Sequence, residues 1–474
     1  MSSQLPPQPK AVLRGHHAQV HAAAFVRENQ RLASGDAEGY VVLWDLTIVR
    51  PRAVWRAHTN AILGIASWGA DKIITHGRDN QLIIWKLAEE DEASLSTTLP
   101  LDPSPSPRPQ PWVLFILPVN TMNFCSFGLC PANDDGTTEE LLVAVPNTLA
   151  SESARLPRTP LLMLCGQVDI YHFPSQKRLH TVASSPKDEK TGMVMSLVLC
   201  RVKSGALTLV TGYENGLAMV TQQSGEEGGT TTTTWDVSYR SQAHGQPILS
   251  LDVSPSRDFF YTSGADANVV KHPIPQQASA YSIPETPTSS PASAEPNVPT
   301  NGLNNDDNSK PAKPVSLLSA ALASAPRPAP VPQKQSVEVR TQPSKVVNTK
   351  HSGQQGLQVR SDGKIFATAG WDSKIRVYSA KTLQELAVLK WHQVGCYTIA
   401  FASLDRPPTA ADDGKTQNDK GSGLANDQSA AVAKTVVPKL VDVTVKDRRI
   451  KQAKETHWLA AGSKDGKISL WDIY

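Results

Sequence analysis

The side chains of this chain that could do chemistry are histidines, each placed ahead of a short apolar run that ends near an acid. His58 precedes Asp79 in this way, His244 precedes Asp266 and His392 precedes Asp465. A histidine held by a carboxylate can act as a general base or as a metal ligand. The arrangement recurs along the chain, however, and this favours a structural role. The imidazole would bridge a turn acid and a strand hydroxyl, and so satisfy buried polar groups.

Other patterns with catalytic or metal-binding potential are incomplete. His16, His17 and His21 are clustered, but no cysteine or carboxylate set with zinc-site spacing accompanies them. Cys125 and Cys130 lack a second cysteine pair, and the sequence contains no nucleophile elbow, phosphate-binding loop or His-Glu-x-x-His motif. We therefore predict no catalytic residue, no metal site, no cofactor and no small-molecule substrate. The protein is not expected to be an enzyme.

The histidines and acids belong to a repeating unit. Val41–Asp45 and Ile468–Asp472 are short apolar runs that end in Trp-Asp, and each follows a turn containing an acid and a glycine. The pair Gly15-His16 stands ahead of the first unit. This is the pattern of a WD40 repeat, which forms one four-stranded blade of a β-propeller. A blade cannot bury its two faces alone, so neighbouring blades must stack around an axis.

The turn acid provides a ruler for counting blades. It stands six positions before the last aromatic or apolar residue of the third strand, as the pairs Glu38 and Trp44, Asp79 and Trp85, Glu214 and Val220, Asp266 and His272, Asp372 and Tyr378, and Asp465 and Trp471 show. Two further Trp-Asp pairs are out of phase with it. In the pair Trp371-Asp372 we place the aspartate in a turn, and we place Trp235-Asp236 in an outer strand.

The gap between Trp85 and Val220 has room for one degenerate blade. Its four strand-like runs are Pro118–Phe127, Leu141–Pro146, Val168–Phe173 and Arg178–Val182. The count is then seven blades, whose third strands end near residues 46, 87, 173, 220, 272, 378 and 474. The alternative is a six-bladed ring with an irregular linker.

The two ends of the chain predict how the ring closes. The last blade lacks an outer strand of its own, and Ala11–Arg14 occupies the position of an outer strand without a blade. Pairing the two would hide both sheet edges. The expected fold class is all-β, a seven-bladed WD40 β-propeller closed by an N-terminal outer strand, and residues 1–474 form a single domain.

Long insertions are expected to interrupt this propeller. Residues 88–111, 275–349 and 403–435 are rich in Pro, Ser, Ala, Asn or charged residues, and we predict that they are disordered. The longest contains Val315–Ala323 as a transient helix. It also carries Thr286-Pro287, Thr288 and Ser290-Pro291, which are candidate phosphorylation sites, although a plain solvated loop is the alternative.

Charge and composition narrow the class of partner. The formal net charge is +3, so no global field calls for nucleic acid or a membrane surface. No apolar run approaches the length of a membrane span. The five cysteines are scattered, which is typical of reduced thiols in a cytosolic or nuclear protein. We therefore expect protein partners, with no direct nucleic acid and no membrane.

Two sets of residues are candidates for contacting such partners. Tryptophans can anchor an interface, although packing between strands is the alternative for each of Trp68, Trp112 and Trp391. A basic cluster precedes the last blade and reads as a nuclear-import signal, a patch for an acidic partner or a solvated face. Its members are Lys446, Arg448, Arg449, Lys451 and Lys454.

Several phrases resemble one particular family of WD40 proteins. The fungal ASTRA-associated WD-repeat family, whose animal relative is a G-protein-beta-like WD protein, is similar to this chain across all the blades but not the insertions. The phrase Ile74–Asn80 is the most specific element. The others are Gly15–Phe25, Leu32–Gly39, Trp55–His58 and Ala461–Trp471.

That resemblance implies a nuclear subunit of the ASTRA complex, with the cytoplasm as a second location. The complex is linked to chromatin remodelling and to chaperone-assisted maturation of phosphatidylinositol-3-kinase-related kinases. The implied partners are other ASTRA subunits and kinase-maturation chaperone adaptors, and the family contributes no catalytic residues. The alternative is a WD40 adaptor of another assembly, either a ubiquitin-ligase substrate receptor or a G-protein-beta-like signalling subunit.

Overall fold

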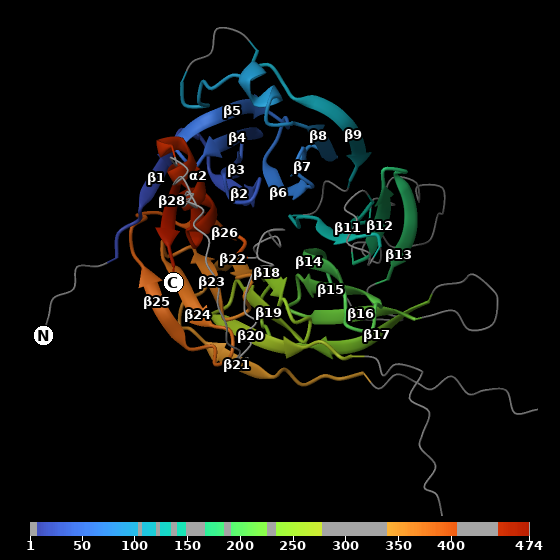
Figure 1. Ribbon diagram of the computed structural model, residues 1–474. Coiled ribbons are helices and arrows are strands. Elements are labelled where there is room, and N and C mark those ends of the chain that lie inside the picture. The colour runs from blue at the N-terminus through green and yellow to red at the C-terminus, as the bar shows by residue number, and fades with distance from the viewer. Residues whose placement is uncertain are drawn as a thin grey trace, which may run out of the picture. The chain divides into compact units, whose positions relative to one another are not determined.

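The computed structural model describes residues 7–102, 107–119, 124–133, 140–147, 166–183, 191–224, 234–276, 339–404 and 444–473. The chain divides into two units, and the second, Gln277–Glu338, lies outside these residues. The first unit contains seven four-stranded antiparallel sheets, arranged around a common axis (Figure 1). These sheets are the blades of a β-propeller, as the repeat pattern predicted.

The first three blades run in chain order from the inner to the outer strand. Blade 1 consists of β2 (Val20–Val26), β3 (Arg31–Asp36), β4 (Tyr40–Asp45) and β5 (Arg50–Arg56). Blade 2 consists of β6 (Ile62–Trp68), β7 (Lys72–Gly77), β8 (Gln81–Lys86) and β9 (Trp112–Pro118). Blade 3 consists of β10 (Gly128–Pro131), β11 (Leu141–Pro146), β12 (Val168–Phe173) and β13 (Lys177–Val182).

The next three blades repeat the same order, and the seventh draws on both ends of the chain. Blade 4 consists of β14 (Val194–Arg201), β15 (Leu207–Tyr213), β16 (Ala218–Ser224) and β17 (Thr234–Ser241). Blade 5 consists of β18 (Ile248–Val253), β19 (Phe259–Gly264), β20 (Asn268–Pro273) and β21 (Lys345–Asn348). Blade 6 consists of β22 (Gln354–Val359), β23 (Ile365–Gly370), β24 (Ile375–Ser379) and β25 (Glu385–Leu389). Blade 7 combines β26 (Cys396–Phe401), β27 (Trp458–Ser463) and β28 (Lys467–Asp472) with β1 (Ala11–Arg14).

The N-terminal strand closes the ring. β1 pairs with β28 from Ala11 opposite Leu470 to Arg14 opposite Lys467, and Leu13 is only 2% exposed. The backbone N–H of Lys10 extends the ladder by donating to the carbonyl oxygen of Leu470 at 2.8 Å. The predicted closure is therefore confirmed, and the edge of β28 and the facing edge of β1 are both paired.

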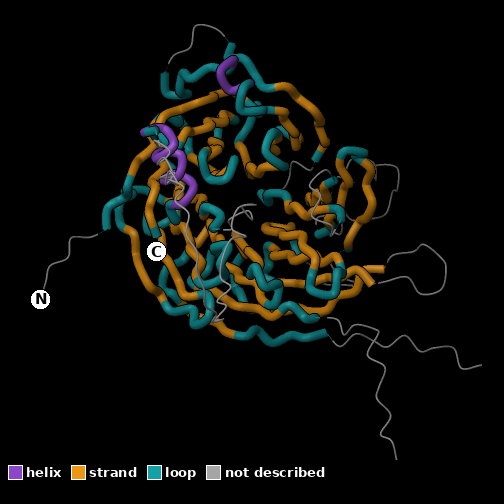
Figure 2. The backbone as a smooth tube through the Cα atoms, in the orientation of Figure 1, coloured by secondary structure: helices purple, strands orange, loops and turns teal. Residues whose placement is uncertain are grey.

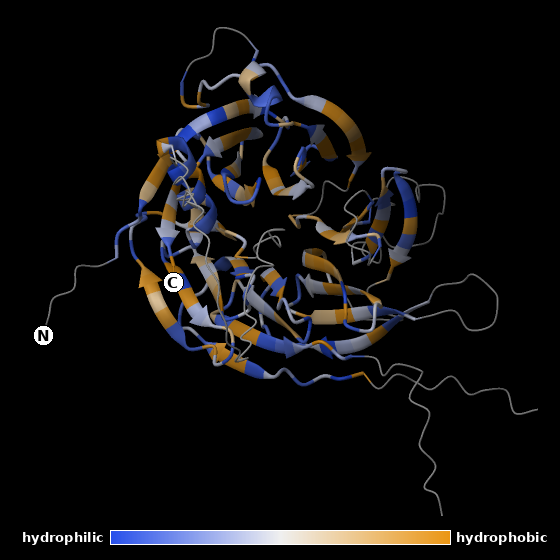
Figure 3. Ribbon diagram, in the orientation of Figure 1, coloured by the Kyte–Doolittle hydropathy of each residue, from blue (hydrophilic) through white to orange (hydrophobic). Residues whose placement is uncertain are grey.

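Neighbouring blades stack because both faces of their sheets are apolar. Strand β2 contacts β6 on one side and β26 on the other, and β14, β18, β22 and β26 follow one another in the same way. Trp55 of blade 1 packs edge-on against Trp85 of blade 2, with ring centres 6.2 Å apart. Strands dominate the described part of the ring, and apolar residues recur along every blade (Figures 2 and 3).

Glycine allows the closest approach between blades. The turn residues Gly39 and Gly466 have φ angles of 86° and 75°, in the left-handed region that glycine adopts without strain. A Cβ on Gly39 would lie 2.0 Å from the carbonyl oxygen of His58 in the next blade, and one on Gly466 would lie 2.2 Å from that of His16. The turn glycines therefore let each blade sit against the histidine segment of its neighbour.

The degenerate blade differs in one run from the prediction. Leu141–Pro146 and Val168–Phe173 are β11 and β12 as expected, and Arg178–Val182 lies within β13. Pro118–Phe127 is wrong as the inner strand, because β10 begins at Gly128 and Pro118 ends β9 of the preceding blade. Apolar residues mark a strand but do not say which sheet receives it. Leu117 pairs with Leu82 of blade 2 and also joins the apolar cluster between blades 2 and 3.

The segment 88–111 is more ordered than predicted over its described residues. It contains the short helix η1 (Asp91–Ser94), in which Glu92 is fully buried. The Glu92 carboxylate lies 3.1 Å from Arg27, 3.2 Å from Arg31 and 3.0 Å from Arg52. Val54 of β5 donates its backbone N–H to Ser96 at 2.7 Å, so the segment covers the edge of blade 1. The composition of the segment could not predict these ion pairs, because the arginines belong to other parts of the chain.

The other two predicted insertions begin or end differently. Residues 277–338 and 405–443 lie outside the described residues, as do Val315–Ala323 and the candidate phosphorylation sites. The range 275–349 extends too far, because Lys345–Asn348 form β21, which pairs with β20. After the second insertion, the helix α2 (Val445–Glu455) carries the basic cluster and is capped by Thr444 and Asp447. No helix among the described residues is long and apolar enough to cross a membrane.

Removing β1 should destabilise the propeller more than its terminal position suggests. We expect deletion of residues 1–14 to lower the free energy of unfolding by about 2–5 kcal/mol, because it removes buried Leu13 and exposes the edge of β28. Deletion of residues 1–9 is the control, since it leaves the β1–β28 ladder intact. Urea unfolding followed by tryptophan fluorescence measures both. Equal stability of the two truncated chains would contradict closure by β1.

Candidate functional site

The histidine and acid pairs are built into the blades as structural ties. In blade 2, His58 Nδ1 lies 2.9 Å from Asp79 Oδ1, and its Nε2 lies 2.8 Å from the hydroxyl of Thr75. The indole of Trp85 donates to the same hydroxyl at 2.9 Å. The His58 side chain is fully buried. The predicted bridge between turn acid and strand hydroxyl is confirmed here.

In blade 1 the acid is Asp36 and not Glu38, so the ruler was wrong for this blade. His16 lies 2.7 Å from Asp36 and 2.7 Å from the hydroxyl of Ser34, while Glu38 meets the exposed His17. Asp36 stands last in β3, where blade 2 has Gly77 at the end of β7. Because glycine offers no side chain at that register position, the turn acid takes the histidine in blade 2. A carboxylate already there takes it in blade 1.

The ties are incomplete in three other blades. In blade 6, Asp372 pairs with Arg376 at 2.6 Å. In blade 7, His392 lies 2.8 Å from the hydroxyl of Ser469, because Ala461 stands where Ser34 and Thr75 stand in blades 1 and 2. Asp465 is bound instead by Lys467 at 2.6 Å. Glu214 of blade 4 accepts from the backbone N–H of Met193 at 3.1 Å.

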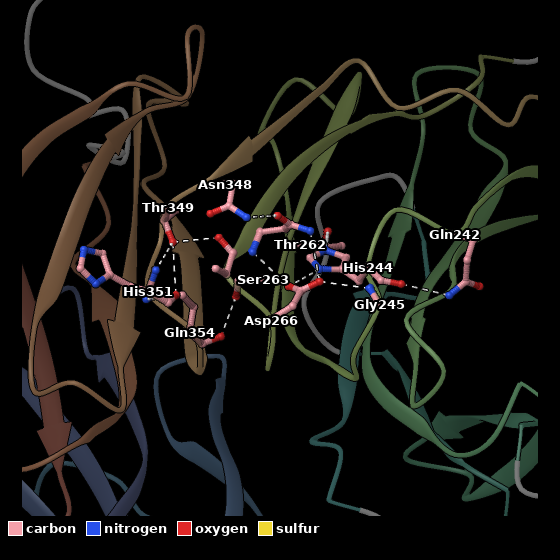
Figure 4. A network of polar contacts seen from close by, with 12 residues as sticks. Gln242, His244, Gly245, Thr262, Ser263, Asp266, Asn348, Thr349, His351 and Gln354 are labelled. Carbon is pink, nitrogen blue, oxygen red and sulfur yellow. Dashed lines mark hydrogen bonds and ion pairs between the residues drawn. The ribbon is translucent and has the colours of Figure 1, made fainter.

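Blade 5 extends its tie into a chain of buried polar groups, part of which Figure 4 shows. His244 lies 2.9 Å from Asp266 and 2.8 Å from the Thr262 hydroxyl. Thr262 also lies 2.9 Å from His272, whose other ring nitrogen is 2.8 Å from the Tyr239 hydroxyl in blade 4. One direction of donation, from the tyrosine hydroxyl through to the carboxylate, satisfies every member. The chain therefore joins blades 4 and 5.

Burial and hydrogen bonding set the charges of these groups. Burial tends to raise the pKa of Asp79, but the hydrogen bonds from His58 and Thr59 outweigh it, and the pKa lies below its ordinary value. The same balance lowers the pKa of Asp266, with His244 as the main donor. Burial holds the pKa of His272 well below its ordinary value, so this ring is neutral.

The cysteines are also structural where they are described. Cys125, Cys200 and Cys396 are free and buried, as expected. Cys130 is also buried, and Cys165 lies outside the described residues. Burial raises the pKa of Cys200 to about 11 and that of Cys396 to about 12. Such thiols are protonated near neutral pH and are poor nucleophiles. Among the residues that the structure places, no group of three His, Cys, Asp or Glu side chains is arranged to hold a metal ion.

The central channel is the candidate binding site. A cavity of about 570 Å³ is lined by residues of every inner strand except β10, and by the segment just before β10. The described lining includes Arg78 and His21 but no carboxylate. Its polar members are Gln19, His21, Asn60, Arg78, Ser126, Ser196, Ser250, Gln355, Tyr397 and Thr398. The lining therefore suits a ligand that carries negative charge and hydrogen-bonding groups.

Aromatic rings hold the two basic groups of the channel. The Arg78 guanidinium lies 4.4 Å from the ring centre of Phe124, and the His21 ring stacks on Tyr397 with centres 5.6 Å apart. Burial lowers the pKa of His21; Asp36 opposes this shift and Arg78 adds to it. Arg78 is therefore the permanent positive charge of the channel. It belongs to the phrase Ile74–Asn80 that the sequence singled out, although no pattern assigned it to a channel.

The three candidate tryptophans separate by exposure. Trp68 is 4% exposed and packs against Phe173 of blade 3, with ring centres 6.3 Å apart. Trp391 packs against the apolar cluster between blades 6 and 7, beside His392. Trp112 is 74% exposed on β9 and is the one candidate that faces solvent.

The basic cluster divides in a similar way. On α2, Lys454 pairs with Glu28 of blade 1, and Lys451 lies 4.0 Å from Glu455. The remaining members of the cluster are exposed at residues 446, 448 and 449. The helix is also anchored to the blades, because Asn29 donates to the carbonyl oxygen of Lys454 at 3.3 Å.

Comparison with known proteins gives one consistent result. The family model described as ASTRA-associated protein 1 matches residues 9–471. The ASTRA-associated protein 1 of Pyricularia oryzae is 50% identical, over 99% of this chain and 98% of its own length. That of Verticillium alfalfae is 49% identical over 99% and 93%, and that of Penicillium rubens is 41% identical over 99% and 98%.

The buried chain in blade 5 depends on one hydroxyl. We expect Thr262→Val to lower the free energy of unfolding by about 1–3 kcal/mol, because it leaves one ring nitrogen of His244 and one of His272 without a buried partner. Thr262→Ser retains the hydroxyl and should cost less. Chemical denaturation of the two variants measures the difference. Unchanged stability with Thr262→Val, or a larger loss with Thr262→Ser, would show that the methyl group of Thr262, and not its hydroxyl, stabilises the joint.

Acid should weaken the joint between blades 2 and 3 through His76. Burial lowers the pKa of His76 to about 3, and its ring packs against Phe127. Since this folded pKa lies below the unfolded value of about 6.5, the contribution of His76 is full above pH 6.5 and is lost as the pH falls below it. Unfolding at pH 7.5 and 5.5 should show an extra loss of about 1.4 kcal/mol that His76→Leu removes. An equal loss between the two pH values in the His76→Leu variant would contradict this assignment.

Proposed function

The chain belongs to the family of ASTRA-associated protein 1, and we propose that it is a non-enzymatic scaffold subunit of the ASTRA complex. The match over residues 9–471 carries the proposal, because it spans nearly the whole propeller and not one blade. A propeller of this kind offers several faces on a single stable body. Fold alone does not choose the partner, and the family supplies that choice.

The burial of the histidines that could act as catalysts supports a scaffold role. The side chains of His16, His58 and His244 are fully buried and held by acids and hydroxyls within the blades. A general base must come within hydrogen-bond reach of its substrate. These rings have no surface for that, so they are suited to positioning blades.

Within the complex, the proposed work concerns chromatin remodelling and the maturation of phosphatidylinositol-3-kinase-related kinases. The proposed partners are other ASTRA subunits and kinase-maturation chaperone adaptors. The proposed location is the nucleus, with the cytoplasm second. The reason for proposing all three is the family to which the chain belongs.

The channel is the proposed contact for one of these partners. Its lining combines Arg78 with hydrogen-bonding side chains and has no described carboxylate. An acidic segment of a protein would gain a charge-assisted hydrogen bond there without meeting like charge. Removing such a bond from a partly buried site typically costs about 1.5–3 kcal/mol.

Purification of the tagged chain from its native cells tests both parts of the proposal. Mass spectrometry of the wild-type complex should recover the ASTRA subunits. Arg78→Glu should reduce that recovery, because a loss of about 1.5–3 kcal/mol weakens binding by about tenfold or more. Arg50→Glu, at an exposed arginine on β5, should leave it unchanged.

The two possible failures are separate. A wild-type complex without ASTRA subunits contradicts the scaffold role. Full recovery with Arg78→Glu contradicts the channel contact and leaves the scaffold role standing.

A further inference from the structure

The outer strand of blade 2 presents an apolar edge to solvent. β9 lies at the edge of its sheet, in the order β6-β7-β8-β9. Its residues, Trp112–Pro118, include no charged side chain, and the indole of Trp112 is their only polar side-chain group. Trp112 is 74% exposed and Ile116 is 47% exposed. Their partners on β8, Lys86 and Ile83, are three positions apart, and side chains an odd number of positions apart on a strand point to opposite faces. Trp112 and Ile116 therefore also point to opposite faces, so both sides of the edge are apolar.

The other six outer strands provide an internal comparison, and each carries charge. The charged residues are Arg14 on β1, Arg50, Arg52 and Arg56 on β5, Lys177 and Arg178 on β13, Asp236 and Arg240 on β17, Lys345 on β21 and Glu385 on β25. Charge on an edge strand discourages pairing with another chain. β9 lacks that protection, and Figure 3 shows its apolar colour along most of its length.

Two of the other edges are also covered by the chain itself. Ser96 bridges to Val54 on β5, and Arg340 forms a parallel bridge with Tyr239 on β17. Ser96 and Arg340 lie within the predicted insertions 88–111 and 275–349, so this chain uses parts of its insertions to cover edges. Within the described ranges, no residue pairs with the outer side of β9.

Positive charge marks one end of this edge. Lys72 pairs with Lys86, and Lys86 pairs with Trp112, so the three side chains stand in a row on one face of blade 2. Lys72 is bound by Asp71 at 2.9 Å and lies 5.3 Å from the ring centre of Trp68. Lys86 is exposed beside Trp112. A carboxylate on an added strand, opposite Trp112, would complete the row.

We propose that β9 is the docking edge for an extended segment of a protein partner, which adds to blade 2 as a fifth strand. The segment carries apolar side chains on both faces along β9 and a carboxylate near Lys86. Main-chain hydrogen bonds supply affinity in this mode of binding, and the side chains supply specificity. The inference deepens the scaffold role proposed above and rests on it.

A second copy of this chain suits the edge less well. If two β9 strands pair antiparallel about Phe115, Trp112 lies opposite Pro118 of the second copy, and no carboxylate comes near Lys86. The charge row therefore points to a different protein.

Hydrogen exchange at β9 tests the proposal directly. The backbone amides of residues 112–117 that do not bond to β8 should exchange at least tenfold more slowly in the complex purified from native cells than in the isolated full-length chain. Amides of residues 385–389 in β25 are the control and should exchange equally in both. A complex that contains ASTRA subunits but leaves β9 unprotected overturns the proposal and spares the scaffold role. Protection that appears in the isolated chain as its concentration rises assigns the edge to a second copy, and also overturns it.

A pair of matched variants tests which side chains matter. Ile116→Lys places charge on the edge, and Leu386→Lys makes the same change on β25, where Leu386 is 56% exposed. Ile116→Lys should remove the exchange protection of β9 and reduce recovery of one ASTRA subunit by about tenfold or more. Its unfolding midpoint should equal that of the control Leu386→Lys. Equal recovery with the two variants overturns the proposal. A wild-type complex that lacks all ASTRA subunits contradicts the scaffold role, and this inference with it.

Discussion

The structure depends on the need of each sheet to bury two apolar faces at once. A four-stranded blade exposes one face unless a neighbour covers it, so the ring is stable only when it is complete. This explains why four N-terminal residues matter. β1 supplies the outer strand of blade 7, and the buried side chain of Leu13 lies where an open seam would otherwise be. Turn glycines such as Gly39 serve the same constraint, because they let the next blade approach.

Closure of the apolar faces also determines what happens to the polar groups between them. Backbone and side-chain polar atoms that leave water must find partners inside the protein. His58, Asp79 and Thr75 satisfy one another in blade 2, and the chain from Tyr239 to Asp266 does so across the joint of blades 4 and 5. The side chains best able to take part in catalysis are thereby used to hold the blades together. What remains for function is the exposed surface and the channel.

The surface available for partners has two distinct characters. The channel is polar and carries the charge of Arg78, whereas the edge of β9 is apolar and has Lys86 at one end. An acidic segment and an extended apolar segment could therefore occupy the same propeller at different places. The segment around Glu92 shows that this chain already covers one edge with its own residues. By contrast, no described residue pairs with the apolar edge of blade 2.

The sequence by itself determined the seven blades, the closing strand and the structural role of the histidines, because these depend on spacing and on alternation that recur in most of the repeats. Only the tertiary structure decided which acid meets which histidine. Asp36 replaces Glu38 because it carries a carboxylate at the register position that is Gly77 in blade 2, and the approach of His16 to that position is not visible along the chain. The same is true of β9, of the Glu92 ion pairs and of the exposure of Trp112. An apolar run predicts a strand, but burial depends on what packs against it from another part of the chain.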